Sequence, residues 1–452
     1  MKKNYQTTTL GARMGRTTPK KARLDAERSG SESAVTLPDT VTVAIAELAG
    51  ELEEGLLAFV VGTGLKVLDV ILEDEATALA GARGRHDPDR TVVRHGSDAG
   101  LVTLGARQVS IRRPRLRTVD KTAEVQLPTY QSASSTELLG RETMARMLAK
   151  LSTRRYAVGL EPVGEAVTAR SRSVSKSAVS RRFVAATESA LAELMSADLS
   201  ELDLVAIMVD GVHFAQHLCV VALGIDIDGT KHPLALAEGD TENATVVKGL
   251  LVGLRERGLD VTKPTLFVLD GAKALPAAVT AVFDHPVMAR CQEHKIRNVK
   301  GHLPKDVAAV VEPRMRAAYR NPDPLAGQGA LEALAKELDR THPGAAGSLR
   351  EGLVETFTVA RLGVPPTLAR TLRSTNPIES MIEICRDHST NVKRWNGGQM
   401  ALRWCAAGMV EAKEQFRRVN GHLHLKTLRA TLEAHVARVT PDRYASRKEV
   451  AA

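Results

Sequence analysis

The sequence predicts an α/β protein: one mixed sheet, interrupted by a helical insertion and preceded by mainly helical regions with a small β-hairpin. Two observations support this. Apolar runs at 204–209, 219–225, 234–237 and 266–269 are separated by turn residues and predict strands. Residues 300–372 lack strand patterns and have helical periodicity. With 452 residues, the chain is too long for a single ordinary domain.

The charge balance favours a polyanionic partner. The chain has 62 Lys and Arg against 53 Asp and Glu, a formal net charge of +9. Clustered basic residues of this kind are typical of proteins that bind nucleic acid. Residues 1–30 carry eight basic side chains, residues 83–117 carry nine arginines, and residues 141–182 carry ten basic side chains. Most of the capacity to bind a polyanion therefore precedes residue 185.

The N-terminal part divides into two segments before residue 141. Residues 1–36 are polar and lack periodicity, which predicts a flexible basic arm. Residues 37–140 combine helical spacing up to about residue 82 with a hairpin pattern from Gly100 to Arg117. The arginines on the polar face of this hairpin could lie on phosphates.

Residues 141–200 are predicted to be helical, with a break near Pro162. A serine cap at Ser175 precedes a helix whose apolar and basic spacing resembles the second helix of a helix-turn-helix. The expected DNA contacts on it are Lys176, Ser177, Arg181 and Arg182. A solvated helical face is the alternative.

Residues 201–299 predict the first part of a core. Three hairpin-linked strands are followed by a helix from Asn243 to Arg257 and then a fourth strand, which is the element order of the ribonuclease H-like fold. Residues 300–372 form the helical insertion, residues 373–440 return to helix, and residues 441–452 are a tail.

Two predicted strands end in an aspartate followed by glycine, at Asp210 and Asp270. An aspartate held by a rigid strand can share divalent metal ions with a second one on a neighbouring strand. Two such ions, ~3.5–4 Å apart, would clamp the attacking and leaving oxygens of a phosphodiester. A single aspartate of this kind is more often a turn or cap residue, but two in one α/β unit favour a site.

A third carboxylate, Glu379, follows a helix-start signal. Asn376 is a good N-cap and Pro377 suits the first helical position, which puts Glu379 at N3. The same spacing is a capping box, so Glu379 could instead serve its own helix.

Together, four motifs closely resemble the Mutator-type transposases of bacterial insertion sequences, from roughly residue 85 to 430. The motifs are Val209-Asp210-Gly211-Val212-His213, Leu269-Asp270-Gly271-Ala272-Lys273-Ala274-Leu275, Arg290-Cys291-Gln292-Glu293-His294-Lys295 and Ser374-Thr375-Asn376-Pro377-Ile378-Glu379-Ser380. The resemblance implies a ribonuclease H-like catalytic domain in which Asp210, Asp270 and Glu379 hold Mg²⁺, with Mn²⁺ as a substitute.

Cys291 and His294 match a Cys-x-x-His element of that family. One Cys and one His supply two of the four ligands of a usual structural zinc site, so packing or shaping of the active site is favoured over zinc. His294, Lys295 and Arg297 are expected to approach DNA phosphates.

Further basic residues follow Glu379. Arg386 lies two turns along the same helix and could hold a phosphate or pair with Glu383. Lys393 and Arg394 flank an aromatic residue in a basic turn, and all three could contact DNA. The aromatic, Trp395, could stack on a base, although core packing is commoner and is expected for Trp404. Residues 300–372 contain no Trp, although the insertions of related transposases often have one.

The resemblance implies an enzyme that binds the terminal inverted repeats of its own element as double-stranded DNA. It would cut with water and then join the freed 3′-hydroxyl to target DNA, acting as at least a dimer. Two alternatives are a ribonuclease H-like nuclease without strand transfer and a catalytically silent repressor bound to the repeats.

The cysteines and the hydropathy of the sequence bear on where in the cell the protein is found. Four scattered cysteines make no disulfide framework, and no secretory pattern is present, so a cytoplasmic protein is expected. The most apolar stretch, residues 56–72, is interrupted by Lys66 and Asp69. It predicts an amphipathic helix and no membrane span.

Overall fold

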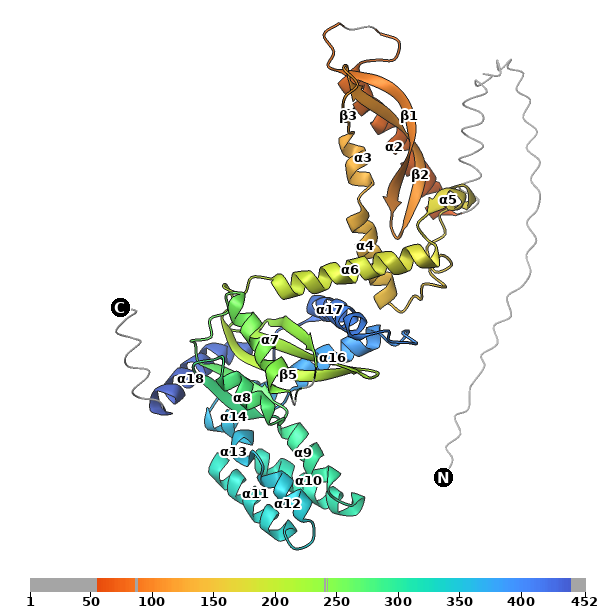
Figure 1. The fold of residues 1–452 in the computed structure, drawn as a ribbon. Coiled ribbons are helices and arrows are strands. Elements are labelled where there is room, and N and C mark those ends of the chain that lie inside the picture. The colour runs from red at the N-terminus through yellow and green to blue at the C-terminus, as the bar shows by residue number, and fades with distance from the viewer. Residues whose placement is uncertain (1–54, 86–87, 240, 242, 440–452) are drawn as a thin grey trace, which may run out of the picture.

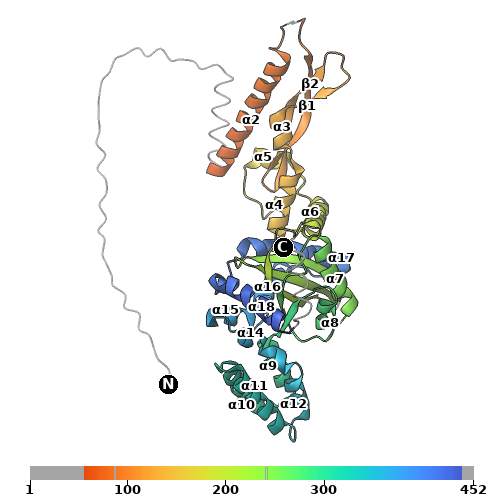
Figure 2. The ribbon, with the colours of Figure 1, turned by 90° about the vertical axis from the view of Figure 1, so that its left-hand side faces the viewer.

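The computed structural model describes residues 55–85, 88–239, 241 and 243–439. The predicted arm at 1–36 and the tail at 441–452 lie outside the described residues. Figures 1 and 2 show three parts in a row: an N-terminal unit, a central sheet covered by helices, and a helical lobe at the opposite end. No helix within the described part of the chain has the length and apolarity needed to cross a bilayer.

The N-terminal unit packs one long helix against a hairpin. Helix α2 (Leu56–Ala80) covers strands β1 (Val92–Leu104) and β2 (Arg107–Thr118), which pair antiparallel around the predicted turn. The short strands β3 (Glu124–Val125) and β4 (Ser171–Arg172) both pair with β2. Buried Leu72, Val109 and Leu127 belong to its core. Helix α3 (Pro128–Ala133) completes the unit.

Three helices connect this unit to the sheet: α4 (Thr136–Leu148), α5 (Glu165–Arg170) and α6 (Lys176–Ser196). The predicted cap is present, since the Ser175 side chain accepts a hydrogen bond from the Ala178 N–H at 3.4 Å. Phe183 of α6 packs on Trp404 of α17 (Gly398–Gln415), with ring centroids 4.6 Å apart. Helix α6 is therefore packed between the N-terminal unit and the core.

The central sheet has five strands: β5 (Leu204–Phe214), β6 (His217–Asp226), β7 (Lys231–Glu238), β8 (Thr265–Leu269) and β9 (Pro286–Arg290). Their order is β7-β6-β5-β8-β9. The first three strands pair antiparallel, whereas β8 and β9 run parallel to β5. This is a mixed sheet, and its three-stranded meander has the order that the sequence predicts.

Helices cover both faces of the sheet (Figure 1). Helices α7 (Ala244–Glu256) and α8 (Ala274–Thr280) pack on the face that carries Ile207, Val209 and Phe267. Helices α16 (Asn376–His388), α17 and α18 (Leu425–Val439) cover the other face. A 3-10 turn, η1 (His422–His424), precedes α18. Apolar residues on both faces explain why the strands are continuous apolar runs.

The helical lobe interrupts the core between β9 and α16. It contains α9 (Gln292–Gly301), α10 (Lys305–Tyr319), α11 (Pro324–Leu338), α12 (Pro343–Arg350) and α13 (Leu353–Thr356). Its own core includes Met315, Leu334 and Leu349. Helices α14 (Thr358–Arg361) and α15 (Pro366–Leu372) lead back to α16. The insertion is helical, as predicted.

Helices α16 and α17 cross at a glycine. A Cβ atom on Gly408 would lie 2.8 Å from the Cα atom of Cys385 and 3.0 Å from its sulfur. Real Cβ atoms do not come this close, so glycine sets the spacing of the two helices. This spacing in turn positions α16, the helix that carries Glu379.

We expect Gly408→Ala to lower the free energy of unfolding by about 1–3 kcal/mol, because the added methyl group overpacks the crossing. The matched control is Gly249→Ala in α7, where nothing lies within 4 Å of the added methyl. There the change should stabilise the helix by about 0.5–1 kcal/mol. Urea unfolding of both variants tests this, and equal effects would contradict it.

Candidate active site

The two aspartates follow paired strand residues. Strand β5 pairs with β8 in parallel register, and the last paired residues are Val209 and Leu269. Asp210 and Asp270 are the next residue on each chain, so both leave this ladder at the same edge. The Asp210 Oδ1 atom accepts from the Gly211 N–H at 2.7 Å, and the Asp270 Oδ1 atom accepts from the Ala272 N–H at 2.9 Å.

Strand β5 differs from the expectation at this point. It was predicted to end at Asp210, but it runs on to Phe214 because the hairpin with β6 continues to the pair Phe214 and His217. Asp210 therefore lies within β5, at a position where β6 still pairs with the strand but β8 no longer does. The hairpin ladder holds its backbone, and its side chain is half-buried.

The loop after Asp270 is shaped by one arginine. Arg290 donates to the Gly271 carbonyl at 3.0 Å and to the Glu351 carbonyl at 2.9 Å. Gly271 has φ +131, and a Cβ atom there would lie 2.3 Å from the guanidinium. Glycine is required both by this backbone conformation and by the arginine.

Helix α16 begins one residue earlier than predicted. Thr375, and not Asn376, is the N-cap residue, so Glu379 is at the fourth helical position. The Glu379 Oε1 atom accepts from the Thr375 hydroxyl at 2.8 Å. The Thr375 N–H donates to the sulfur of Cys291 at 3.4 Å, so the reciprocal bond of a capping box is not formed.

Cys291, His294 and Thr375 surround the Glu379 carboxylate. The buried sulfur of Cys291 caps α9 by accepting from the His294 N–H at 3.4 Å. The His294 Nδ1 atom lies 3.2 Å from the Thr375 hydroxyl and 3.7 Å from Glu379 Oε1. The start of α9 and the start of α16 therefore meet, which brings Glu379 to the same part of the core as the aspartates.

The charges of the three carboxylates act on one another. Burial, followed by the charges of Asp270 and Glu379, raises the pKa of Asp210 to about 6, against the opposing Gly211 N–H and His294. The contact with Cys291 and the nearby acids raise the pKa of His294, although burial opposes this. Burial would raise the pKa of the Cys291 thiol, but the hydrogen bonds from His294 and Thr375 outweigh it and lower that pKa.

Glu379 belongs to two candidate sets of metal ligands. Within the described part of the chain, Cys291, His294 and Glu379 have ligand atoms within 4.8 Å of one another. The Cys291 sulfur already accepts from Thr375 and His294, and a usual structural zinc site needs a fourth ligand. Asp210, Asp270 and Glu379 offer oxygen atoms, the donor type that Mg²⁺ prefers, and the charges of Asp270 and Glu379 add to the burial that raises the pKa of Asp210. Among the described residues these three carboxylates do not form a group whose ligand atoms all lie within 4.8 Å of one another. By donor type they suit Mg²⁺ better than zinc.

Two predicted DNA contacts have other partners in the structure. Lys295 is 1% exposed and donates to the carbonyls of Ser348 and Glu351, so the expectation that it reaches DNA phosphates is wrong. Arg182 donates to the Ser173 carbonyl at 2.6 Å and to the Thr143 hydroxyl at 2.9 Å. Both cations stabilise the protein itself. Periodicity could not show this, because it does not reveal which main-chain carbonyls a side chain reaches.

The other predicted contacts are on the surface or in the site. Lys176, Ser177, Arg181, Arg297, Lys393 and Arg394 are exposed, whereas His294 lies beside Glu379. Trp395 packs against Phe214, with ring centroids 4.9 Å apart, which favours packing over base stacking. Trp404 is in the core, as expected.

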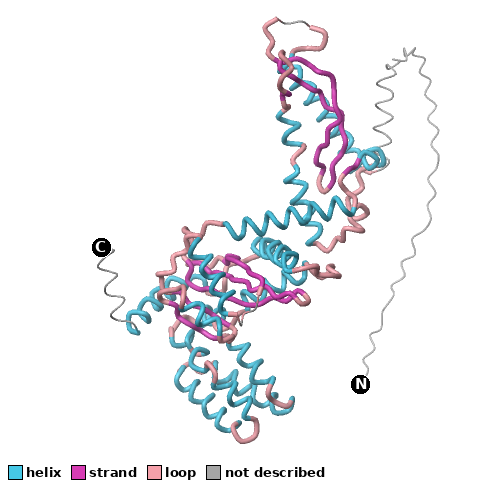
Figure 3. The backbone as a smooth tube through the Cα atoms, viewed as in Figure 1, coloured by secondary structure: helices cyan, strands magenta, loops and turns pink. Residues whose placement is uncertain are grey.

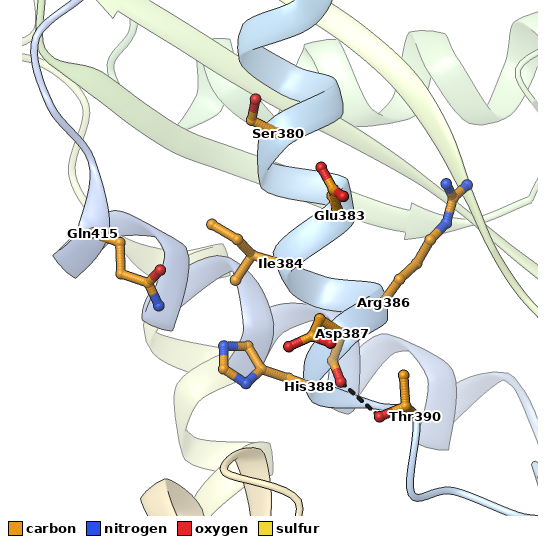
Figure 4. Close-up of a pocket in the computed structure, with 8 residues that line it drawn as sticks. All are labelled: Ser380, Glu383, Ile384, Arg386, Asp387, His388, Thr390 and Gln415. Atoms are coloured by element: carbon orange, nitrogen blue, oxygen red, sulfur yellow. Dashed lines mark hydrogen bonds between the residues drawn. The ribbon is translucent and has the colours of Figure 1, made fainter. Parts of the chain in front are cut away.

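Arg386 lines a surface hollow on α16 that also contains Ser380 and Glu383 (Figure 4). Within the described residues no ion pair joins Arg386 to Glu383, and the guanidinium extends away from that carboxylate in the figure. Arg386 therefore stays available as a phosphate ligand.

Sequence reasoning missed Thr375 and Arg290. Thr375 directly precedes the Asn376-Pro377 helix signal, and a hydroxyl residue at that place is a frequent N-cap. Arg290 directly precedes Cys291 at the end of a strand. Its partners, Gly271 and Glu351, could not be found from local spacing.

Comparison with known proteins identifies a family and similar proteins for this chain. A family model described as "Transposase, Mutator family" matches residues 42–419. The chain is 26% identical over 366 residues to the transposase for insertion sequence element ISRM5 of Rhizobium meliloti (strain 1021), covering 80% of this chain and 90% of the relative. It is 30% identical over 249 residues to the transposase for insertion sequence element IS6120 of Mycolicibacterium smegmatis, covering 54% and 76%.

We expect Asp210→Asn to stabilise the protein near pH 7.5 in a chelating buffer. The pKa of Asp210 is raised from 3.8 to about 6, so ionisation costs the folded state stability as the pH rises through this window. The gain should be up to about 3 kcal/mol above pH 6 and should disappear toward pH 4.

Thermal unfolding at both pH values measures this gain. The control is Asp228→Asn, whose side chain is exposed. A stabilisation by Asp210→Asn that did not depend on pH would contradict the electrostatic origin.

Proposed function

Because the chain belongs to the Mutator family of transposases, we propose that it is the transposase of an insertion sequence and cuts and joins DNA at Asp210, Asp270 and Glu379. The observation that carries the proposal is that Asp210 and Asp270 directly follow the last paired residues of the neighbouring strands β5 and β8. Burial, together with the charges of Asp270 and Glu379, raises the pKa of Asp210. Carboxylates that repel one another in a half-buried site are poised to bind cations.

We propose further that the core is ribonuclease H-like. The support is the sheet order β7-β6-β5-β8-β9, with three antiparallel strands, a crossover through α7 and two parallel strands. Asp210 lies on the central strand of this sheet, and Asp270 ends the strand beside it. In a parallel crossover arrangement of this kind, ligands bind at the carboxyl ends of the strands.

Asp210, Asp270 and Glu379 would hold the Mg²⁺ ions. When bound, these ions neutralise charge on the phosphate and favour ionisation of the attacking hydroxyl. The chain's own residues orient the carboxylates: Gly211 and Ala272 donate backbone N–H groups to the aspartates, and Thr375 donates to Glu379. His294 lies beside Glu379 and is a positioning residue.

The reaction comprises two in-line displacements at phosphorus. Water attacks the phosphodiester at the end of the element, and the bond to the 3′-oxygen breaks to leave a free 3′-hydroxyl. That hydroxyl then attacks a phosphodiester of target DNA and displaces another 3′-oxygen. Each step exchanges one P–O bond for another, so one site serves both and no nucleotide cofactor is needed.

We assign recognition of the terminal inverted repeats to residues 37–140 and 141–200. The support is the exposed basic face of α6, with Lys176 and Arg181, and the arginine-rich hairpin of β1 and β2. Holding two ends together requires at least a dimer on DNA. Phosphate contacts of this kind release counterions, so binding should weaken steeply with salt.

We expect Asp270→Asn and Glu379→Gln to abolish cleavage and strand transfer while leaving repeat binding nearly unchanged. The assay uses oligonucleotides that carry the element's end, with Mg²⁺ or Mn²⁺. Asp228→Asn is the control and should retain activity. Cleavage without any joined product would instead indicate a nuclease, and full activity of either variant would remove that carboxylate from the site.

We expect Thr375→Val to lower kcat about 10- to 100-fold, as is typical when a residue that orients a metal ligand is lost. Valine keeps the shape but removes the hydroxyl that donates to Glu379 at 2.8 Å. Thr375→Ser restores the hydroxyl and should recover most of kcat. If valine and serine behaved alike, Thr375 would matter for packing only.

A further inference from the structure

Two adjoining hollows lead away from the proposed active site. The first, about 470 Å³, contains Asp270 and His294, and the second, about 570 Å³, reaches the end of α9 and the residues Gly344, Gly347 and Ser348 of α12. They share Lys273, Asn298 and Glu351, so they form one continuous depression. We call it the α9–α12 groove.

Three basic side chains of the groove have no hydrogen-bond or ion-pair partner among the described residues. Lys273, Arg297 and His302 are exposed, and no other described residue forms a hydrogen bond or ion pair with their side chains. The acid that they surround, Glu351, lies 3.5 Å from Arg290 and is balanced by it. Beyond Asp270, the free charge of the groove is therefore positive.

Two glycines line the groove at positions where a larger side chain would fill it. Gly301 and Gly347 both have open space at the position of a Cβ atom. A backbone-lined wall allows a ligand to come close. From His294 to His302 the groove follows α9 for about 12 Å at the helical rise.

We propose that the α9–α12 groove binds one strand of DNA that continues from the phosphate at the active site, through phosphate contacts with Lys273, Arg297 and His302. This inference rests on the proposed function, since DNA at Asp270 is what leads a strand into the groove. The two open hollows are continuous along α9 and can take the sugar-phosphate backbone of one strand. The helical insertion thereby becomes part of the substrate site.

The first test removes charge. The double variant Lys273→Ala with Arg297→Ala is compared with Lys336→Ala with Arg340→Ala, which removes the same charges from exposed positions of the insertion outside the groove. The probe is an end oligonucleotide with an unpaired strand past the cleavage position, without divalent metal. The slope of log K against log salt should fall by about 1.4 for the groove pair, at ~0.7 for each single-strand phosphate contact.

The second test fills the groove without changing charge. Gly347→Leu adds a side chain to the open wall, and leucine is compatible with a helix. Gly329→Leu, at another exposed glycine of the insertion with open space, is the control. Gly347→Leu should weaken binding of the unpaired probe at least tenfold and leave a fully paired probe that stops at the cleavage position unaffected.

The outcomes separate this inference from the proposed function. Loss of binding in both groove variants, with both controls normal, supports the groove. If only the charge variant weakens binding, the attraction is general electrostatics and the groove proposal is overturned. Normal binding by both groove variants also overturns it. Failure of the unaltered protein to cut its own ends with Mg²⁺ overturns the proposed function itself. Equal melting temperatures exclude misfolding.

Discussion

The parallel ladder between β5 and β8 is the constraint on which the proposed site depends. It ends at Val209 and Leu269, so Asp210, which still pairs with β6, and Asp270, which follows β8, both lie next to the same end of this ladder. Burial, followed by the charges of Asp270 and Glu379, raises the pKa of Asp210 to about 6. The free energy for that arrangement comes from the buried apolar faces on either side of the sheet.

The third carboxylate, Glu379, lies on a helix that follows the helical insertion and contacts the start of α9. Helix α9 leaves the sheet at Cys291, the insertion folds on its own core, and α16 returns with Thr375 against that same cysteine. One buried thiol thus accepts hydrogen bonds at the starts of two helices. The proposed site depends on this return because it brings Glu379 near Asp210.

The sequence predicted strands, helices and the insertion well because each has its own local pattern of apolar residues and turns. The boundaries near the site were less predictable. Strand β5 continues past Asp210 because β6 continues to pair with it. The N-cap of α16 is Thr375 and not Asn376, because the sulfur of Cys291 accepts a hydrogen bond from the Thr375 N–H. Lys295 and Arg182 have the local pattern of DNA-binding cations, yet both donate to main-chain carbonyls of the protein itself. Tertiary contacts of this kind leave no mark on local spacing.

Arg290 joins two glycines that are far apart in the sequence. Its guanidinium fills the space beside Gly271, next to Asp270, and beside Gly352, where the insertion rejoins the core. A side chain at either glycine would collide with it. Arg290 and the two glycines therefore depend on one another. A chimera that exchanged the helical lobe between related enzymes would have to keep all three residues. Otherwise the loop after Asp270 would lose its shape.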